Sequence, residues 1–227
     1  MRVHWLQHAD FEDLGCIAPA LAARGDTVMH TRLYAGETLP ALEAFDALIV
    51  MGGPMNIYEY DAHPWLKPEK ALIREAIAQN KRVLGVCLGS QLIADALGGP
   101  VTRNAHTEIG WLPVTLNAAG RASKFFAGFP ERFTAFHWHG DTFAIPPQAQ
   151  NLMASEGCAH QALEYGERVV GIQFHLEVTA ANAREWFVHE RPQPARYVQD
   201  ADAILTDLDA FATNNRLMLK LLDNWLR

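Results

Sequence analysis

The segment Lys81–Gln91 constrains the fold of this chain more than any other. A short, mostly apolar run typical of a strand leads directly into Gly85-Val86-Cys87-Leu88-Gly89, and a sequence that favours a helix follows from Leu88 to Leu97. A cysteine with glycine two residues before and two residues after it is typical of a tight strand-to-helix turn that presents a nucleophile. The N-terminus of the helix favours the thiolate form of such a cysteine. A buried core cysteine at the end of a strand is the alternative that this segment alone leaves open.

Strand and helix patterns alternate along the first half of the chain. We expect strands at Val3–Gln7, Thr27–Thr31 and Ala47–Met51, and helices at Leu14–Arg24 and from Pro68 to about Gln79. Repeated strand–helix units predict a parallel sheet with helices on both faces. Such sheets carry their sites at the carboxyl ends of the strands, which is where Gly52-Gly53 and Cys87 fall.

The pattern changes after Val101. Short alternating strands are predicted at Trp111–Leu116, Arg132–Trp138, Gln161–Tyr165 and Arg168–Phe174, as an antiparallel extension of the same sheet. Helices follow at Ala180–His189, with Thr179 as the N-cap, and from about Asp202 to Leu226. The expected fold is therefore α/β, a three-layer sandwich with a mostly parallel central sheet, an antiparallel extension and C-terminal helices. We expect a single domain over residues 1–227, with a core at about 1–190 and a helical extension at about 191–227.

Composition excludes several classes of function. The chain has 227 residues, a net charge of -7 and no cluster of Lys and Arg, so neither nucleic acid nor an anionic membrane is an expected partner. No apolar run reaches the length of a membrane span, and the N-terminus turns polar too early for a signal peptide. The cysteines Cys16, Cys87 and Cys158 form no Cys-x-x-Cys pair. This spacing indicates a reducing, cytoplasmic location and neither a disulfide framework nor a zinc site.

A thiol nucleophile needs a base, and the base needs a group that orients it. His175 and Glu177 lie two residues apart at the end of a predicted strand, so both side chains leave the same face. A carboxylate next to a histidine stabilises the imidazolium that forms when the ring takes a proton. Cys87, His175 and Glu177 therefore form a geometrically reasonable triad. Each of the last two also has a simpler interpretation, His175 as an ordinary strand-end histidine and Glu177 as an acidic residue near a helix start.

An acyl-transfer site also needs backbone N–H groups that stabilise the developing oxyanion. Leu88, directly after the cysteine, can supply one such group. Gly52-Gly53-Pro54 ends a neighbouring strand and can supply another, because glycine lets the backbone approach a ligand closely. A simple tight turn is the alternative interpretation of these glycines.

Together these motifs resemble the class I, triad-type glutamine amidotransferases, and in particular the glutaminase domain of GMP synthases. The matching segments are Met51–Pro54, Gly85–Gln91 and Gln173–Glu177. A fourth, His137–Asp141, resembles the His-Gly-Asp segment of that family. The resemblance covers residues from about 1 to 190 and implies the flavodoxin-like fold of these enzymes.

The resemblance also implies roles for individual residues. It implies Cys87 as the nucleophile, His175 as the base, Glu177 as its orienting partner and the N–H groups of Gly53 and Leu88 as oxyanion donors. It further implies that glutamine is contacted by Gln91, Trp138, His139, Gly140 and Asp141. No metal and no organic cofactor is expected. The chain departs from the family at Leu176, where proline is usual, which makes the placement of Glu177 less certain.

The implied activity is hydrolysis of the glutamine side-chain amide to glutamate and ammonia through a γ-glutamyl thioester. The chain has no nucleotide-activating motif, so we expect a stand-alone form that passes ammonia to a separate synthetase partner. A γ-glutamyl hydrolase or peptidase is the main alternative. Two further alternatives are a catalytically silent regulatory module and a metal-dependent hydrolase, the latter suggested by His137-x-His139-x-Asp141. The oligomeric state is left open.

Overall fold

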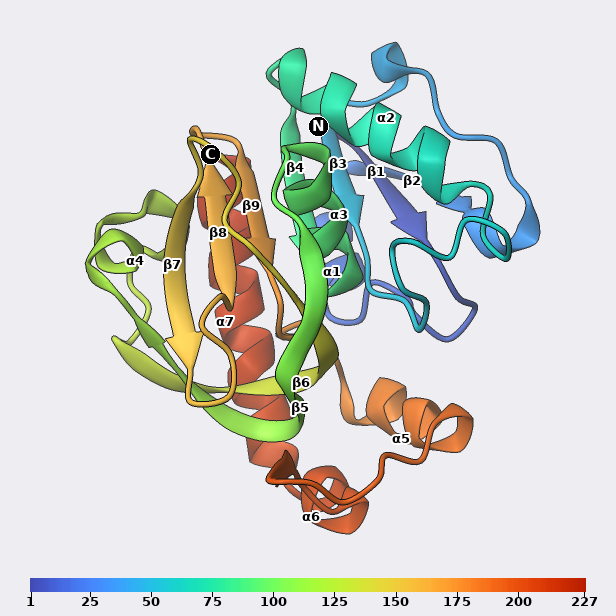
Figure 1. Cartoon of the computed structure of the whole chain (residues 1–227). Coiled ribbons are helices and arrows are strands. Elements are labelled where there is room, and N and C mark those ends of the chain that lie inside the picture. The colour runs from blue at the N-terminus through green and yellow to red at the C-terminus, as the bar shows by residue number, and fades with distance from the viewer.

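The computed structural model describes all residues 1–227 and contains one mixed sheet between layers of helices (Figure 1). Its parallel part runs in the order β2-β1-β3-β4-β9. These strands are β1 (Arg2–Gln7), β2 (Thr27–Arg32), β3 (Ala47–Val50), β4 (Arg82–Val86) and β9 (Val169–Ile172). All residues of β3 and β9 are buried, as expected for central strands covered on both faces.

The antiparallel part continues from β9 through β8 (Ala162–Tyr165) and β7 (Gln150–Ser155) to β5 (Val101–Leu116), which also pairs with β6 (Arg132–Phe143). A short parallel strand, β10 (Tyr197–Val198), lies on the outer edge of β5. The predicted extension is confirmed, and β8 and β9 are short strands where Gln161–Tyr165 and Arg168–Phe174 were predicted. The short strands predicted at Trp111–Leu116 and Arg132–Trp138 are wrong in length. β5 has 16 residues and β6 has 12, and β7 was not predicted. The first half of β5 is polar because it is largely exposed, which hides the alternation that marks a strand.

Helices cover both faces of the sheet and complete the three predicted layers. On one face α2 (Leu66–Ala78) and α3 (Leu88–Ala96) bury Ile73 and Ile93 against β3 and β4. On the other face lie α1 (Ile17–Ala23) and α7 (Leu208–Leu226). The α/β three-layer fold is therefore confirmed. No helix of the chain combines the length and apolar character needed to cross a membrane.

The C-terminal region differs from the prediction in one respect. The single helix expected from Asp202 to Leu226 is two helices, α6 (Ala201–Thr206) and α7, because Asp207 leaves the helical conformation and its side chain accepts a hydrogen bond from the N–H of Ala210. The apolar stripe of α7 packs on the core, as predicted. Helix α5 (Ala180–His189) begins at the predicted cap, Thr179. The remaining elements are α4 (Ala118–Ala122) and the 3-10 helices Leu33–Ala35, Leu42–Ala44 and Lys124–Phe126.

Candidate active site

Cys87 lies in a strained turn between β4 and α3. Its φ of 51° and ψ of -108° are rare for a residue with a side chain. Both neighbouring glycines are required by close packing. A Cβ atom on Gly89 would lie 1.9 Å from the carbonyl oxygen of Val50, and one on Gly85 would lie 2.6 Å from the backbone of Gly89. The turn therefore has the geometry that the Gly-x-Cys-x-Gly spacing predicts.

His175 and Glu177 form a buried pair beside this turn. Nδ1 of His175 and Oε1 of Glu177 are 2.7 Å apart, and both side chains are 2% exposed. Burial alone would lower the pKa of His175, but the Glu177 carboxylate and Cys87 outweigh it and raise that pKa well above its usual value. His175 and Cys87 line the same cavity of about 400 Å³. The structure thus brings together the three residues predicted as a triad.

The backbone from Leu176 to Val178 is fixed by contacts from distant parts of the chain. Asn215 of α7 donates hydrogen bonds of 3.0 Å to the carbonyls of Leu176 and Val178. The N–H of Cys16 donates to the carbonyl of Glu177 at 2.9 Å. The Leu176 side chain is fully buried in the core. Leucine therefore costs this segment little rigidity, because tertiary hydrogen bonds restrain it where proline would restrain it locally.

The glycine turn after β3 reaches the same cavity as Cys87. A Cβ atom on Gly53 would lie 2.8 Å from Cδ2 of Leu88, so only glycine brings this backbone so close to the start of α3. Nδ1 of His8 lies 2.8 Å from the carbonyl oxygen of Gly52, and Nε2 of His8 lies 2.8 Å from Oε1 of Glu69. A carbonyl only accepts, so Nδ1 is the donor.

The His8 contact has a directional consequence. In a trans peptide the C=O and N–H groups point in opposite directions. His8 holds the Gly52 carbonyl, and the N–H of Gly53 in the same peptide unit is therefore directed away from His8. The His8–Glu69 pair is fully buried, so water does not compete for the hydrogen bonds that hold this peptide unit in place.

The residues predicted to contact glutamine line a second cavity, of about 160 Å³, which shares Cys87 and Gly53 with the first. Its lining includes all five predicted contacts: Gln91, Trp138, His139, Gly140 and Asp141. Gln91 is held by its amide, which donates to Oε1 of Gln173 at 3.2 Å. Gln173 in turn donates to Sγ of Cys87 at 3.7 Å.

Sequence reasoning missed several polar groups at the site. His8 and Glu12 follow β1, the neighbour of β3, and the rule that sites gather at the carboxyl ends of parallel strands was the available signal. Glu12 lines the cavity with His175, and burial raises its pKa to about 7. Arg103 lies on β5 opposite Asp141, with Nη1 3.4 Å from Oδ1, and no sequence pattern marked it.

Comparison with known proteins agrees with this geometry. The family model described as "Glutamine amidotransferase class-I" matches residues 16–190. The glutamine amidotransferase-like protein YfeJ of Salmonella typhimurium is 38% identical over 199 residues, which cover 86% of this chain and 83% of YfeJ. The GMP synthase of Thermomicrobium roseum is 35% identical over 132 residues, which cover 58% of this chain but only 23% of that synthase.

Solved structures give the same result over the whole chain. A glutamine amidotransferase from Thermotoga maritima is 33% identical, with a TM-score of 0.90 and coverage of 100% of this chain and 98% of that one. A glutamine amidotransferase from Methylobacillus flagellatus is 34% identical, with a TM-score of 0.92 and coverage of 99% and 94%. The family model covers most of the sequence, and the site motifs sit where that fold carries its chemistry. The chain therefore belongs to the class I glutamine amidotransferase family.

Proposed function

We propose that this chain hydrolyses the side-chain amide of glutamine, releasing glutamate and ammonia. The observation that carries the proposal is the strained Cys87 turn, which lines a cavity together with His175, and His175 is paired with the buried Glu177. A thiol, a basic imidazole and a carboxylate that orients the imidazole are the groups that acyl transfer through cysteine requires.

In the first half-reaction the thiolate of Cys87 attacks the side-chain carbonyl carbon of glutamine. The N–H groups of Gly53 and Leu88 stabilise the tetrahedral oxyanion, and the His8 contact orients the Gly53 donor. The protonated His175 then gives its proton to the departing nitrogen, and ammonia leaves. Glu177 holds the imidazolium through Nδ1 in this step.

In the second half-reaction His175 takes a proton from water, and the resulting hydroxide attacks the γ-glutamyl thioester. The carbon–sulfur bond breaks and glutamate is released, with Cys87 as the leaving thiolate. No metal or organic cofactor takes part in either half.

The cleft also suits the amino-acid end of glutamine. Arg103 and Asp141 present opposite charges at its rim, which match the α-carboxylate and the α-ammonium of a free amino acid. Gly140 allows this arrangement, because a Cβ atom there would lie 2.5 Å from Nη1 of Arg103. We propose Gln91, Trp138, His139 and Gly140 as further contacts in the same cleft.

The test is turnover of glutamine by the purified chain, with ammonia and glutamate measured separately. The Cys87→Ala variant is the matched control, and an acid quench during turnover followed by mass spectrometry detects the thioester on Cys87. Equal turnover by both proteins would contradict the proposal. γ-Glutamyl anilides and peptides in parallel assays test the alternative γ-glutamyl hydrolase, which requires faster cleavage of those amides than of glutamine.

We further propose that the ammonia passes to a synthetase on a separate polypeptide. The support is that the GMP synthase match covers about a quarter of that enzyme and leaves the rest of it without a counterpart in these residues. Stimulation of glutamine turnover by a copurifying synthetase and its acceptor substrate is the expected result.

A further inference from the structure

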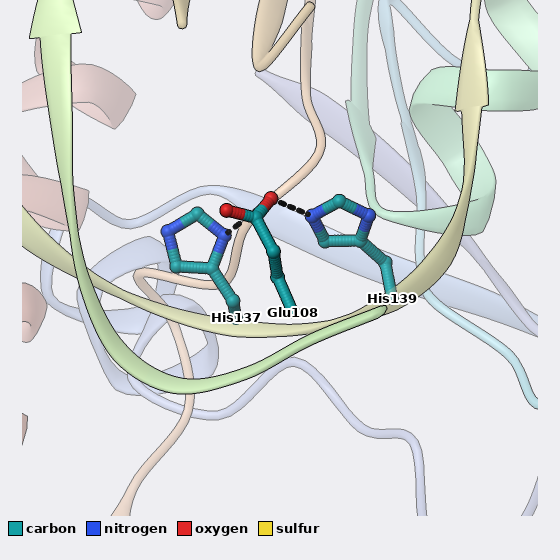
Figure 2. A group of neighbouring side chains, drawn as sticks. All are labelled: Glu108, His137 and His139. Atoms are coloured by element: carbon teal, nitrogen blue, oxygen red, sulfur yellow. Dashed lines mark ion pairs between the residues drawn. The ribbon is translucent and has the colours of Figure 1, made fainter. Parts of the chain in front are cut away.

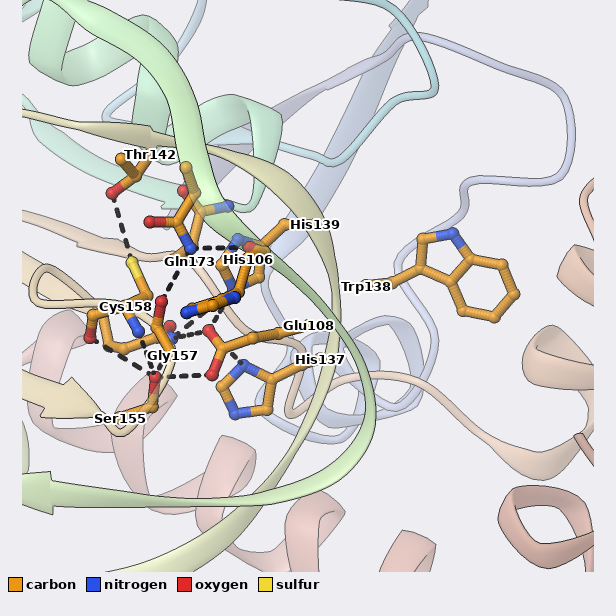
Figure 3. A network of polar contacts seen from close by, with 12 residues as sticks. His106, Glu108, His137, Trp138, His139, Thr142, Ser155, Gly157, Cys158 and Gln173 are labelled. Carbon is orange, nitrogen blue, oxygen red and sulfur yellow. Dashed lines mark hydrogen bonds and ion pairs between the residues drawn. The ribbon is translucent and has the colours of Figure 1, made fainter. Parts of the chain in front are cut away.

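Three buried side chains converge behind the wall of the cleft, from two paired strands. Glu108 of β5 is the direct register partner of His139 of β6. His137 lies two residues before His139, so both rings project from the same face of β6, while Trp138 projects away from them (Figure 3). Figure 2 shows the Glu108 carboxylate between the two imidazole rings. All three side chains are at most 1% exposed.

The donor atoms of this cluster are close together. Oε2 of Glu108 is 3.1 Å from Nε2 of His139 and 3.8 Å from Nδ1 of His137, and all three atoms lie within 4.8 Å of one another. Ligand atoms around a tetrahedral zinc ion are about 3.3 Å apart. Small rotations of the side chains would therefore place all three around one ion.

The hydrogen bonds of His139 and Glu108 match those of metal ligands. Nδ1 of His139 lies 3.0 Å from the carbonyl oxygen of Asp141, so Nδ1 carries the proton of the neutral ring. Its Nε2 lone pair then faces the Glu108 carboxylate at 3.1 Å, and the only other group near it is the amide of Gln161, at the long distance of 3.5 Å. A cation between the nitrogen and the carboxylate, or a second proton on the ring, would relieve the repulsion between the two lone pairs. A metal-bound histidine typically donates its other N–H to a carbonyl in this way. Glu108 in turn accepts from Ser155 at 2.6 Å and from Gln161 at 2.7 Å, as ligating carboxylates do.

The surroundings of His137 favour a metal ion over a second proton on His139. Neither of the buried ring nitrogens of His137 makes a hydrogen bond of normal length and angle, since the backbone of Leu112 offers only a weak contact, and this is costly in a protein interior. A second proton on His139 would satisfy Glu108 but would leave His137 unpartnered. A metal ion would bind Nδ1 of His137 directly, since this atom lies 3.8 Å from Oε2 of Glu108 and points into the cluster.

We propose that Glu108, His137 and His139 bind a divalent transition-metal ion of the zinc class. Two imidazole nitrogens and one carboxylate oxygen form a donor set that zinc commonly accepts. The ion would join β5 to β6 and brace the part of the cleft wall that carries His139 and Gly140. Asp141 is not a ligand, since it pairs with Arg103, so the site differs from the one that the His-x-His-x-Asp spacing suggested. The proposal does not depend on the glutaminase reaction.

The test is metal binding in the Cys87→Ala background, which removes the reactive thiol as a competing ligand. Protein stripped with chelator is dialysed against zinc, and bound metal is measured by mass spectrometry. We expect about one zinc ion per chain in this parent and in the His106→Ala control, which alters a histidine of β5 that lies outside the cluster. Loss of an outer partner of a metal site already costs about 10- to 100-fold in affinity, so His137→Leu should cost at least 100-fold.

Two readouts keep the test independent of folding defects. His137→Leu removes two buried nitrogens that lack hydrogen bonds of normal geometry, so the metal-free variant should be at least as stable as its parent. Zinc should raise the melting temperature of the parent and of His106→Ala, but not that of His137→Leu. The cobalt-loaded parent should show the absorption bands of a four- or five-coordinate ion. Three results would each overturn the proposal. The first is a folded parent that retains no zinc, and the second is a His137→Leu variant that binds zinc as tightly as the parent. The third is nitrogen NMR that shows both ring nitrogens of His139 protonated when zinc is present.

Discussion

The two halves of the candidate active site are built in different ways. The Cys87 turn carries a constraint that its own sequence marks, since Gly85 packs against Gly89 four residues later; the contact of Gly89 with Val50 of β3 adds a constraint from a distant segment. The His175–Glu177 segment has no such local constraint. Its backbone is held by the N–H of Cys16 and the side chain of Asn215, which lie more than 30 residues away in either direction. A nucleophile turn can thus be recognised from a short motif, whereas the position of its base depends on the whole fold.

The largest effect is expected in the Cys87 half of the site, when the thiol is removed. Cys87→Ala should lower glutamine turnover by about 10⁴-fold or more, because no other group can form the acyl intermediate. Cys87→Gly should be equally inactive but more stable than Cys87→Ala by about 1 kcal/mol, because glycine adopts a φ of 51° without strain. Chemical denaturation of the two inactive proteins measures the difference. Equal stability would show that the turn is not strained.

Packing of the turn gives the next largest effect. Gly89→Ala places a Cβ atom 1.9 Å from a backbone oxygen, which neither strand nor helix can move to relieve, so we expect destabilisation of more than about 4 kcal/mol. Gly166→Ala is the control for a clash-free site, since no atom lies within 4 Å of a Cβ there and its positive φ of 59° is the only source of strain. That change should cost only about 1 kcal/mol. Unfolding in guanidinium chloride measures both, and similar costs would mean that steric packing does not define the turn.

Near His175, in the half of the site that depends on distant residues, the buried carboxyl of Glu12 should make the stability of the chain depend on pH. Burial raises the pKa of this carboxyl from 4.5 to about 7 in the folded chain, so folding takes up a proton between these values. Its contribution is therefore favourable at low pH and is lost as the pH rises from about 4.5 to 7, by up to about 3 kcal/mol. Glu12→Gln cannot ionise and should gain stability relative to wild type from pH 5 to pH 8. A difference between the two proteins that does not change with pH would contradict the assignment.

His8 tests whether a distant side chain orients an oxyanion donor. The amide nitrogen of asparagine is as many bonds from Cα as Nδ1 of histidine, and that of glutamine as many as Nε2. His8→Asn should keep the hydrogen bond to Gly52, whereas His8→Gln should keep only the contact with Glu69. We expect kcat for glutamine to fall by about 10- to 100-fold in His8→Gln, with little change in KM, and to fall much less in His8→Asn. The reverse order would exclude the orienting role.

The smallest effect is expected at Asn215. Asn215→Ala removes two hydrogen bonds to the backbone around Leu176, so it should cost about 2 kcal/mol of stability and reduce turnover by about tenfold. Leu176→Pro in the Asn215→Ala background should recover part of the turnover if restraint of this backbone is what Asn215 provides. Arg216→Ala is the control, because the side-chain hydrogen bond of this exposed neighbouring residue is to Thr213 on its own helix. Failure of Asn215→Ala to change turnover would show that this segment holds its geometry without α7.

The sequence predicted most of what short-range physics controls. The spacing of glycines around Cys87, the cap at Thr179 and the periodicity of α7 each depend on residues within a few positions, and the structure has all three. The break at Asp207 was missed because an aspartate is compatible with a helix interior by pattern alone, and only its cap hydrogen bond to Ala210 shows that a new helix begins.

Tertiary structure alone decided the features that depend on pairing between distant segments. The polar first half of β5 is a strand because it pairs with β6 and β10, and the pairing with β6 brought Glu108 to His137 and His139 across 29 residues or more of sequence. The same holds for His8, which reaches Gly52 and Glu69 through the order of the strands. A sequence fixes which chemical groups are present and how nearby residues fold, because those forces act over a few residues. Which distant groups meet is set by strand order and register, since burial and hydrogen bonding are satisfied only in the complete sheet.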